Sequence, residues 1–155
     1  MSIINNREIL NNLFYSFGSC LQNSIINKKT LKDKYGIETT IKVGSLGFGL
    51  KDNVFYEYGY LNEKKFEKNY KKDNGLFDLH FWLEDTNGNI IDCFYYEYNS
   101  ICRINNVKCL FKQYSLIRNK KELLKRMGIH YLELNNKKLG KKIIKEVTYT
   151  VYKRI

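Results

Sequence analysis

Three residues that lie far apart in the sequence have the side chains needed for nucleophilic chemistry. Cys20 lies in the segment SFGSCLQNS, and His80 and Asp92 are the two ends of HFWLEDTNGNIID. A thiol with an ordinary pKa of about 8.5 becomes a good nucleophile when an imidazole takes its proton. A carboxylate on the other ring nitrogen fixes the tautomer of that imidazole. The pattern therefore predicts a triad with Cys20 as nucleophile, His80 as base and later acid, and Asp92 as orienting group.

The segment around Cys20 has the periodicity of helices. Apolar residues recur at three- and four-residue spacing over residues 3–32, and Gly18 and Ser19 interrupt them. The interruption predicts a second helix from about Ser19 to Lys34, with Ser19 as its N-cap. Cys20 would then lie in a first turn, where the helix dipole favours a thiolate and backbone N–H groups can bind an oxyanion. The alternative is one continuous helix with Cys20 as a small buried residue.

The segment from His80 to Asp92 has the pattern of a β-hairpin. Its alternation predicts strands at about 77–84 and 90–97, with a turn that contains Asn87 and Gly88. Side chains along a strand point alternately to opposite faces of the sheet. The length of the turn therefore decides whether the histidine and the aspartate share a face.

Only one hairpin register brings the two side chains together. A two-residue turn places Asp92 opposite Leu83, on the face that His80 does not share. A three-residue loop with Gly88 in the left-handed conformation places Asp92 opposite Trp82. Asp92 is then a diagonal neighbour of His80, at a backbone distance of about 7–8 Å. The triad hypothesis therefore predicts the bulged hairpin.

The other patterns predict a single α+β domain that covers residues 1–155. The further expected elements are a strand at 37–43 after Gly36, a loop at Gly44, Gly47 and Gly49, a strand at 54–60, a charged exposed connection at 62–75, a hairpin with its turn at Asn105-Asn106, a helix at 119–127 stopped by Gly128, a short strand or link at 129–135 and a strand at Val147–Tyr152. We find no internal repeat and no linker in the chain.

Composition narrows the class of protein. Hydrophobic residues make up 43% and aromatic residues 15% of the chain, which excludes a disordered composition. The sequence contains no run of about 18 apolar residues, so it predicts no membrane span. The N-terminus lacks the pattern of a signal peptide. We therefore expect a cytoplasmic protein whose four cysteines are mostly reduced thiols.

The net charge of +11 suggests a second interpretation of the chain. Such a charge attracts nucleic acid, an acidic membrane surface or an acidic protein. Lysine is also a common residue of solvated surfaces, and the sequence contains no recognised nucleic-acid-binding motif. A basic binding module therefore stays open as an alternative to an enzyme.

Metal binding has little support in the sequence. Cys93, Cys102, Cys109 and His130 offer ligand types, but they contain no Cys-x2-Cys pair. That spacing is poor for structural zinc. We predict no metal and no organic cofactor.

Taken together, these segments resemble the transglutaminase-like cysteine enzymes. The matching patterns are GSC at a helix start, the strand GIETTIKVG and the hairpin HFWLED-TNGNIID, within roughly residues 10 to 98. The resemblance implies a papain-like α+β core in which the Cys-bearing helix packs on an antiparallel sheet. It also implies Cys20, His80 and Asp92 as the catalytic residues and Trp82 as a packing partner.

The chain departs from the family pattern at several positions. Cys93 stands where a proline often follows the aspartate, and the spacing from histidine to aspartate is short. No glutamine lies upstream of the nucleophile to complete an oxyanion hole, so Asn11, Asn12 and Gln22 are the substitutes to consider.

The sequence leads to two functional hypotheses. The first is cysteine-dependent acyl chemistry on an amide or peptide substrate, through a thioester at Cys20, with hydrolysis or amide transfer as its outcome. The second is a non-catalytic basic module on a degenerate transglutaminase-like scaffold. That module would bind nucleic acid or an acidic protein partner.

Overall fold

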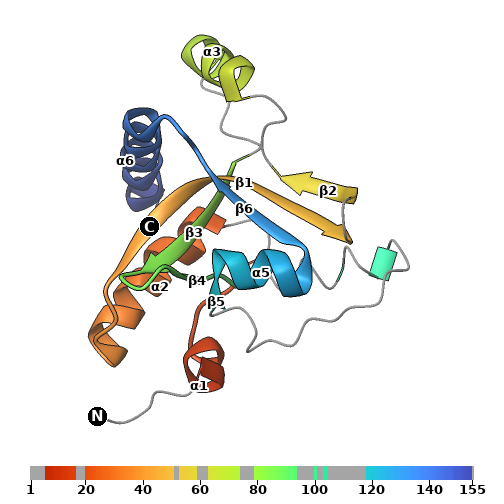
Figure 1. Cartoon of the computed structure of the whole chain (residues 1–155). Coiled ribbons are helices and arrows are strands. Elements are labelled where there is room, and N and C mark those ends of the chain that lie inside the picture. The colour runs from red at the N-terminus through yellow and green to blue at the C-terminus, as the bar shows by residue number, and fades with distance from the viewer. Residues whose placement is uncertain are drawn as a thin grey trace.

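The computed structural model describes residues 6–16, 20–50, 53–58, 63–73, 79–93, 100, 103–104 and 118–154. In chain order the elements are α1 (Asn6–Asn11), α2 (Cys20–Tyr35), β1 (Thr39–Leu50), β2 (Asn53–Tyr58), α3 (Glu63–Asp73), β3 (His80–Asp85), β4 (Asn89–Ile91), β5 (Arg118–Asn119), α5 (Lys120–Met127), β6 (Ile129–Glu133) and α6 (Lys137–Arg154) (Figure 1). This mixture of helices with an antiparallel sheet confirms the α+β class.

The sheet is organised on the long strand β1. Residues 39–44 of β1 pair with β3, residues 44–48 pair with β6, and residues 46–50 pair with β2. β4 pairs with β3, and β5 pairs with β4. Within the described residues the sheet has six strands, and each of these pairings is antiparallel. β1 therefore connects the hairpin that carries His80 to the later strand β6.

The expected loop at Gly44, Gly47 and Gly49 is wrong, because β1 continues through all three glycines. Gly44 pairs with His80 of β3 and also with Glu133 of β6. A Cβ atom at this position would lie 2.0 Å from the carbonyl oxygen of Leu132. A glycine here therefore permits the close approach of two backbones rather than a turn.

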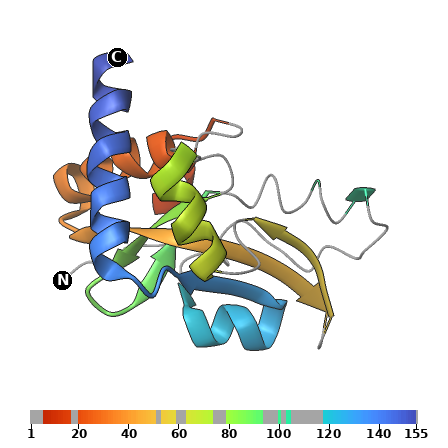
Figure 2. The same ribbon diagram turned by 90° about the horizontal axis from the view of Figure 1, so that it is seen from above.

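One face of the sheet packs on α2 and α6. Figure 2 shows these two helices on one side of the sheet and α5 on the other side, beside β6. Leu21 and Ile25 of α2 join Val43, Phe81 and Ile143 in one buried cluster. Burial of this apolar surface fixes α2 against β1 and β3, and so fixes the position of its first residue.

A second buried cluster extends this layer toward α1. It contains Ile9, Leu31, Leu83 and Ile91. Phe81 and Leu83 of β3 face this layer, and His80 and Trp82, which alternate with them, are buried on the opposite face. The Cys-bearing helix therefore packs on an antiparallel sheet, as the sequence predicts.

Helix ends follow the local signals in the sequence. Gly36, with a φ of 65°, follows the last residue of α2, and Gly128, with a φ of 64°, follows the last residue of α5. Asn119 caps α5, because its side chain accepts a hydrogen bond from the backbone N–H of Glu122. The predicted helix that Gly128 stops is confirmed.

The expected strand at Val147–Tyr152 is wrong, since this segment is part of helix α6. Leu139 and Ile143 are buried one helical turn apart, and the Asn136 side chain accepts a hydrogen bond from the N–H of Leu139. β-Branched residues favour strands only weakly, and packing against β1 and α2 overrides that preference.

The charged connection expected at 62–75 contains the helix α3. Glu63 accepts hydrogen bonds from the backbone N–H groups of Asn135 and Asn136. Tyr70 is buried, and its hydroxyl donates to Glu146 of α6 at 2.6 Å. These contacts hold a lysine-rich segment as a helix beside α6.

Some predictions fall on residues outside the described part of the chain. They are the N-cap at Ser19, residues 94–97 of the second hairpin strand and the turn at Asn105-Asn106. Within the described residues, none of the helices has the length and apolar character required to cross a membrane.

Candidate active site

The β3–β4 hairpin adopts the bulged register. Leu83 pairs with Ile91, and Glu84 pairs with Ile90, which leaves a three-residue loop at 86–88. Gly88 has a φ of 80°, in the left-handed region that favours glycine. This is the register that the triad hypothesis requires, so the prediction of the loop is confirmed.

Asp85 explains why the loop forms at this position. Its carboxylate accepts hydrogen bonds from the backbone N–H groups of Asn87 and Asn89, at 2.9 and 2.8 Å. Its carbonyl oxygen accepts from the N–H of Gly88 at 3.1 Å. A short acidic side chain before an Asn-Gly pair therefore closes the turn and fixes the register.

His80 and Asp92 form a direct, buried hydrogen bond. The distance between His80 Nε2 and Asp92 Oδ2 is 2.6 Å. The side chains are only 4% and 8% exposed, so water hardly competes for this contact. The diagonal placement predicted from the sequence thus brings the two groups into contact.

Tyr131 of β6 is a third member of this hydrogen-bonded group. Its hydroxyl donates to the same Asp92 oxygen at 2.9 Å, and its side chain is buried. The carboxylate of Asp92 therefore accepts from an imidazole and from a phenol. Two donors on one oxygen hold the carboxylate in a single orientation.

Trp82 packs beside this group, as the resemblance implies. It is fully buried, and its ring is stacked on that of His80 with a centroid distance of 6.1 Å. Tyr131 meets the Trp82 ring edge-on, at 5.1 Å. The aromatic rings restrict the imidazole to the plane in which it meets Asp92.

Cys20 lies where the start of α2 meets the start of β3. It is the first residue of the helix and is half-buried. Its Sγ is 3.8 Å from the carbonyl oxygen of Leu79, the residue before His80. The thiol lies near enough to the His80 imidazole to contribute to the raised pKa of that group. The structure therefore brings Cys20, His80 and Asp92 together.

The pKa of His80 is raised from its ordinary value of 6.5 to about 10. Burial alone lowers this pKa, because it disfavours the imidazolium. The charge and the hydrogen bond of Asp92 outweigh burial, and Cys20 adds to their effect. His80 is consequently an imidazolium at neutral pH.

Two asparagines of α2 hold the chain segment that leads to Cys20. Asn27 accepts from the N–H of Phe14 at 2.7 Å and donates to the Phe14 carbonyl at 2.9 Å. Asn23 makes the same pair of bonds with Ser16, at 3.0 and 3.1 Å. Each side-chain amide thus pairs with the backbone as a neighbouring strand would.

Asn27 also connects this segment with the end of β4. Its Nδ2 atom donates to the Cys93 sulfur at 3.6 Å. Burial and the charge of Asp92 raise the pKa of Cys93 to about 12, although the Asn27 hydrogen bond opposes them. Cys93 is therefore a neutral thiol next to the candidate site.

The candidate oxyanion residues lie in different surroundings. Gln22 is in the first turn of α2, two residues after Cys20, and is half-buried. Asn12 is exposed, donates to the Glu8 carbonyl at 2.9 Å and accepts from Lys34 at 2.9 Å. Asn11 is exposed at the end of α1. Of the three, Gln22 is nearest to Cys20 in the sequence and on the same helix.

Sequence reasoning missed Tyr131, Asn23 and Asn27. Asn23 and Asn27 lie four residues apart on the buried face of α2. Polar residues at such positions predict hydrogen bonds to buried partners, and this spacing could have indicated their role. Tyr131 carries no such signal. Its role depends on the pairing of β6 with β1, which joins segments distant in the sequence.

The described residues contain no group of three or more histidine, cysteine, aspartate or glutamate side chains that could hold a metal ion. Comparison of the chain with protein-family models, with curated proteins and with solved structures gives no match in any of the three. Only the geometry of the site therefore indicates a function for this chain.

Proposed function

We propose that this chain is a transglutaminase-like cysteine enzyme that performs acyl chemistry on an amide or peptide through a thioester at Cys20. The observation that carries the proposal is the buried 2.6 Å contact between His80 and Asp92, with the Cys20 thiol against the same imidazole. A nucleophile, a base and an orienting group in mutual contact are the parts that this chemistry needs.

The proposed reaction has two steps. In the first, the Cys20 thiolate attacks the carbonyl carbon of the amide, and the N-terminal N–H groups of α2 stabilise the resulting oxyanion. The His80 imidazolium gives its proton to the leaving amine as the C–N bond breaks, which leaves a thioester on Cys20.

In the second step, water or an amine attacks the thioester. His80 takes a proton from the incoming nucleophile and keeps it as the C–S bond breaks, which restores the Cys20 thiolate and the His80 imidazolium. Water gives hydrolysis and an amine gives transfer. Asp92 stabilises the imidazolium in both steps, and Tyr131 holds Asp92 in place.

The direct test is capture of the acyl-enzyme with p-nitrophenyl acetate. We expect release of p-nitrophenolate and an acetyl group on Cys20, located by peptide mass spectrometry. His80→Ala should slow this acetylation about 100-fold, while Cys93→Ser should change it less than about twofold. Addition of a primary amine then separates transfer from hydrolysis, because transfer yields the acetylated amine.

Two outcomes would contradict the proposal. One is acetylation of Cys20 no faster than that of the other cysteines in the folded chain. The other is acetylation that His80→Ala leaves unchanged. Either result would favour the non-catalytic basic module, which needs no reactive thiol.

A further inference from the structure

A cavity of about 640 Å³ lies away from the candidate active site, between α2 and α6 and over β1. Its lining residues are Ile25, Lys28, Thr40, Ile41, Lys141, Ile144, Lys145 and Thr148. None of them belongs to the group around Cys20, His80 and Asp92. This volume lies within the range of about 300–1,000 Å³ that is typical of small-molecule sites.

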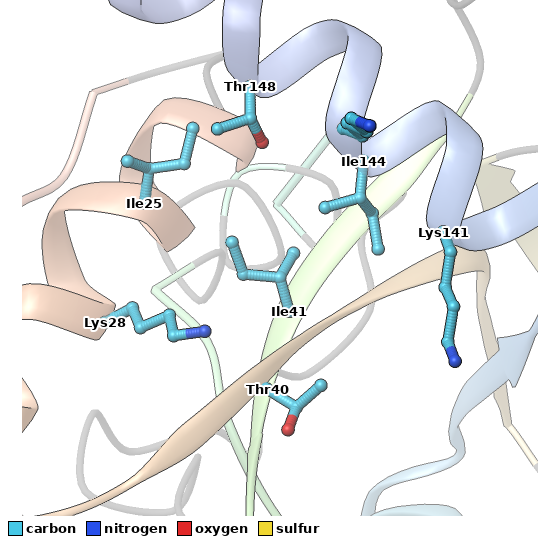
Figure 3. Close-up of a pocket in the computed structure, with 8 residues that line it drawn as sticks. Ile25, Lys28, Thr40, Ile41, Lys141, Ile144 and Thr148 are labelled. Carbon is cyan, nitrogen blue, oxygen red and sulfur yellow. The ribbon is translucent and has the colours of Figure 1, made fainter.

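The cavity has an apolar floor made by three isoleucines. Ile25 comes from α2, Ile41 from β1 and Ile144 from α6, and Figure 3 shows their side chains converging. The described residues that line the cavity include no aromatic side chain, so this part of its wall has no stacking surface of the kind that nucleic-acid bases need. Branched aliphatic walls instead favour an aliphatic ligand.

The rim of the cavity is positively charged. Lys28, Lys141 and Lys145 line it, and none of the described lining residues is acidic. Lys28 and Lys141 stand on opposite sides of the isoleucines in Figure 3. The three lysines form no ion pair with any residue in the described part of the chain. Their charges are thus available to an acidic group that enters the rim.

Neighbouring lysines of α6 behave differently. Lys137 pairs with Glu133 at 2.8 Å, and Lys142 lies 4.0 Å from Glu146. These lysines point to carboxylates of the protein rather than to the cavity. The positive rim is therefore a local feature, distinct from the general excess of lysine.

The wall of the cavity also has unused hydrogen-bonding capacity. The Thr148 hydroxyl is buried and forms no hydrogen bond within the described structure. Buried hydroxyl groups in proteins generally have a partner. A polar atom of a ligand placed between the two helices would supply one.

From these observations we propose that the cavity binds a small anionic amphiphile of the fatty-acid class. The aliphatic chain lies on Ile25, Ile41 and Ile144, and the carboxylate lies at Lys141 and Lys145 of the rim. The site is independent of the acyl chemistry at Cys20, since it shares none of the residues that carry out that chemistry.

Isothermal titration calorimetry with laurate, below its critical micelle concentration, tests this proposal. We expect one laurate to bind per chain and dodecyltrimethylammonium, which has the same chain length and the opposite charge, not to bind. The double variant Lys141→Ala/Lys145→Ala should weaken laurate binding about tenfold. The matched control is Lys138→Ala/Lys142→Ala, which removes the same charge from the same helix outside the cavity and should change binding less than about twofold.

Ile144→Trp fills the cavity and should abolish binding in a chain whose circular dichroism is unchanged. Three results would overturn the proposal. They are the absence of laurate binding, equal binding of dodecyltrimethylammonium or neutral dodecanol, and equal weakening by the two lysine pairs. The last result would mean that charge anywhere on α6 suffices. Because the assay involves no thiol, its failure is distinguishable from failure of the proposed acyl chemistry.

Discussion

Cys20 and Cys93 are two thiols of the same site in opposite electrostatic surroundings. Cys20 is half-buried at the start of a helix, against the His80 imidazole. Cys93 is buried, and burial together with the charge of the neighbouring Asp92 carboxylate raises its pKa to about 12. Burial and the neighbouring charge therefore both distinguish the two thiols, because burial and an anion disfavour a thiolate and a cation favours one.

The charge of the Asp92 carboxylate contributes to both environments. Asp92 raises the pKa of His80 and so keeps the imidazole positive beside Cys20. The same carboxylate raises the pKa of Cys93. One buried carboxylate thus raises the pKa of a histidine beside Cys20 and the pKa of Cys93. Changes to this carboxylate or to His80 should therefore alter the difference in reactivity between the two thiols.

Replacement of His80 should have the largest effect on the difference in alkylation rate between Cys20 and Cys93. His80→Gln removes the cation beside Cys20 and keeps a polar side chain, so alkylation of Cys20 by iodoacetamide at pH 7 should slow about 100-fold. Alkylation of Cys93 should change less than about twofold. Rates are followed by mass spectrometry of the labelled peptides. Equal slowing of both thiols would indicate general damage to the fold.

The protonation of His80 should also make the free energy of unfolding depend on pH. Its folded pKa of about 10 lies above the ordinary 6.5, so its contribution is fully present below pH 6.5 and is lost as the pH rises toward 10. Across this window the unfolding free energy of the native sequence, relative to His80→Gln, should fall by on the order of 1 kcal/mol per pH unit. Urea unfolding at pH 6 to 10 measures it. A difference that is flat or rises with pH would contradict a buried imidazolium.

Removal of the Asp92 charge should reduce the difference between the alkylation rates of Cys20 and Cys93, because it should slow the first and accelerate the second. Asp92→Asn lowers the pKa of His80 and also that of Cys93, since its charge raises both. We expect alkylation of Cys20 at pH 7 to slow about tenfold and that of Cys93 to accelerate severalfold. Glu84→Gln, a carboxylate on the same strand face as His80, is the matched control and should leave both rates within about twofold.

Tyr131→Phe should have a smaller effect, because it removes a single hydrogen bond. Loss of the donor to Asp92 should slow alkylation of Cys20 about threefold and lower the unfolding free energy by about 0.5–1.5 kcal/mol. Tyr70→Phe is the control, since it loses a hydroxyl bond to Glu146 away from the site. Equal slowing by the two variants would mean that Tyr131 does not position Asp92.

Short-range patterns in the sequence predicted the hairpin loop and the placement of Asp92 beside His80. The Asp85 side chain and the left-handed Gly88 fix a three-residue loop, and strand alternation then places Asp92 beside His80. Gly36, Asn119 and Gly128 end or begin helices for reasons that lie within a few residues of each. In these places, sequence neighbours determine the structure.

Long-range contacts produced the differences between prediction and structure. The segment with Val147 and Thr148 has the composition of a strand, but packing against β1 and α2 makes it helical. Gly44 suggests a loop, but it permits the backbone of Leu132 to approach β1. Tyr131 reaches Asp92 only because β6 pairs with β1, which no local pattern indicates.

The most direct test of a Cys20–His80 couple is the ratio of alkylation rates of Cys20 and Cys93 at pH 6. An unassisted thiol with an ordinary pKa of about 8.5 is only about 0.3% ionised at this pH. In the folded native chain we predict that iodoacetamide alkylates Cys20 at least about 100 times faster than Cys93, and that the ratio falls to about one in denaturant. A ratio near one in the folded chain, or faster alkylation of Cys93, would contradict the assignment of Cys20 as the nucleophile.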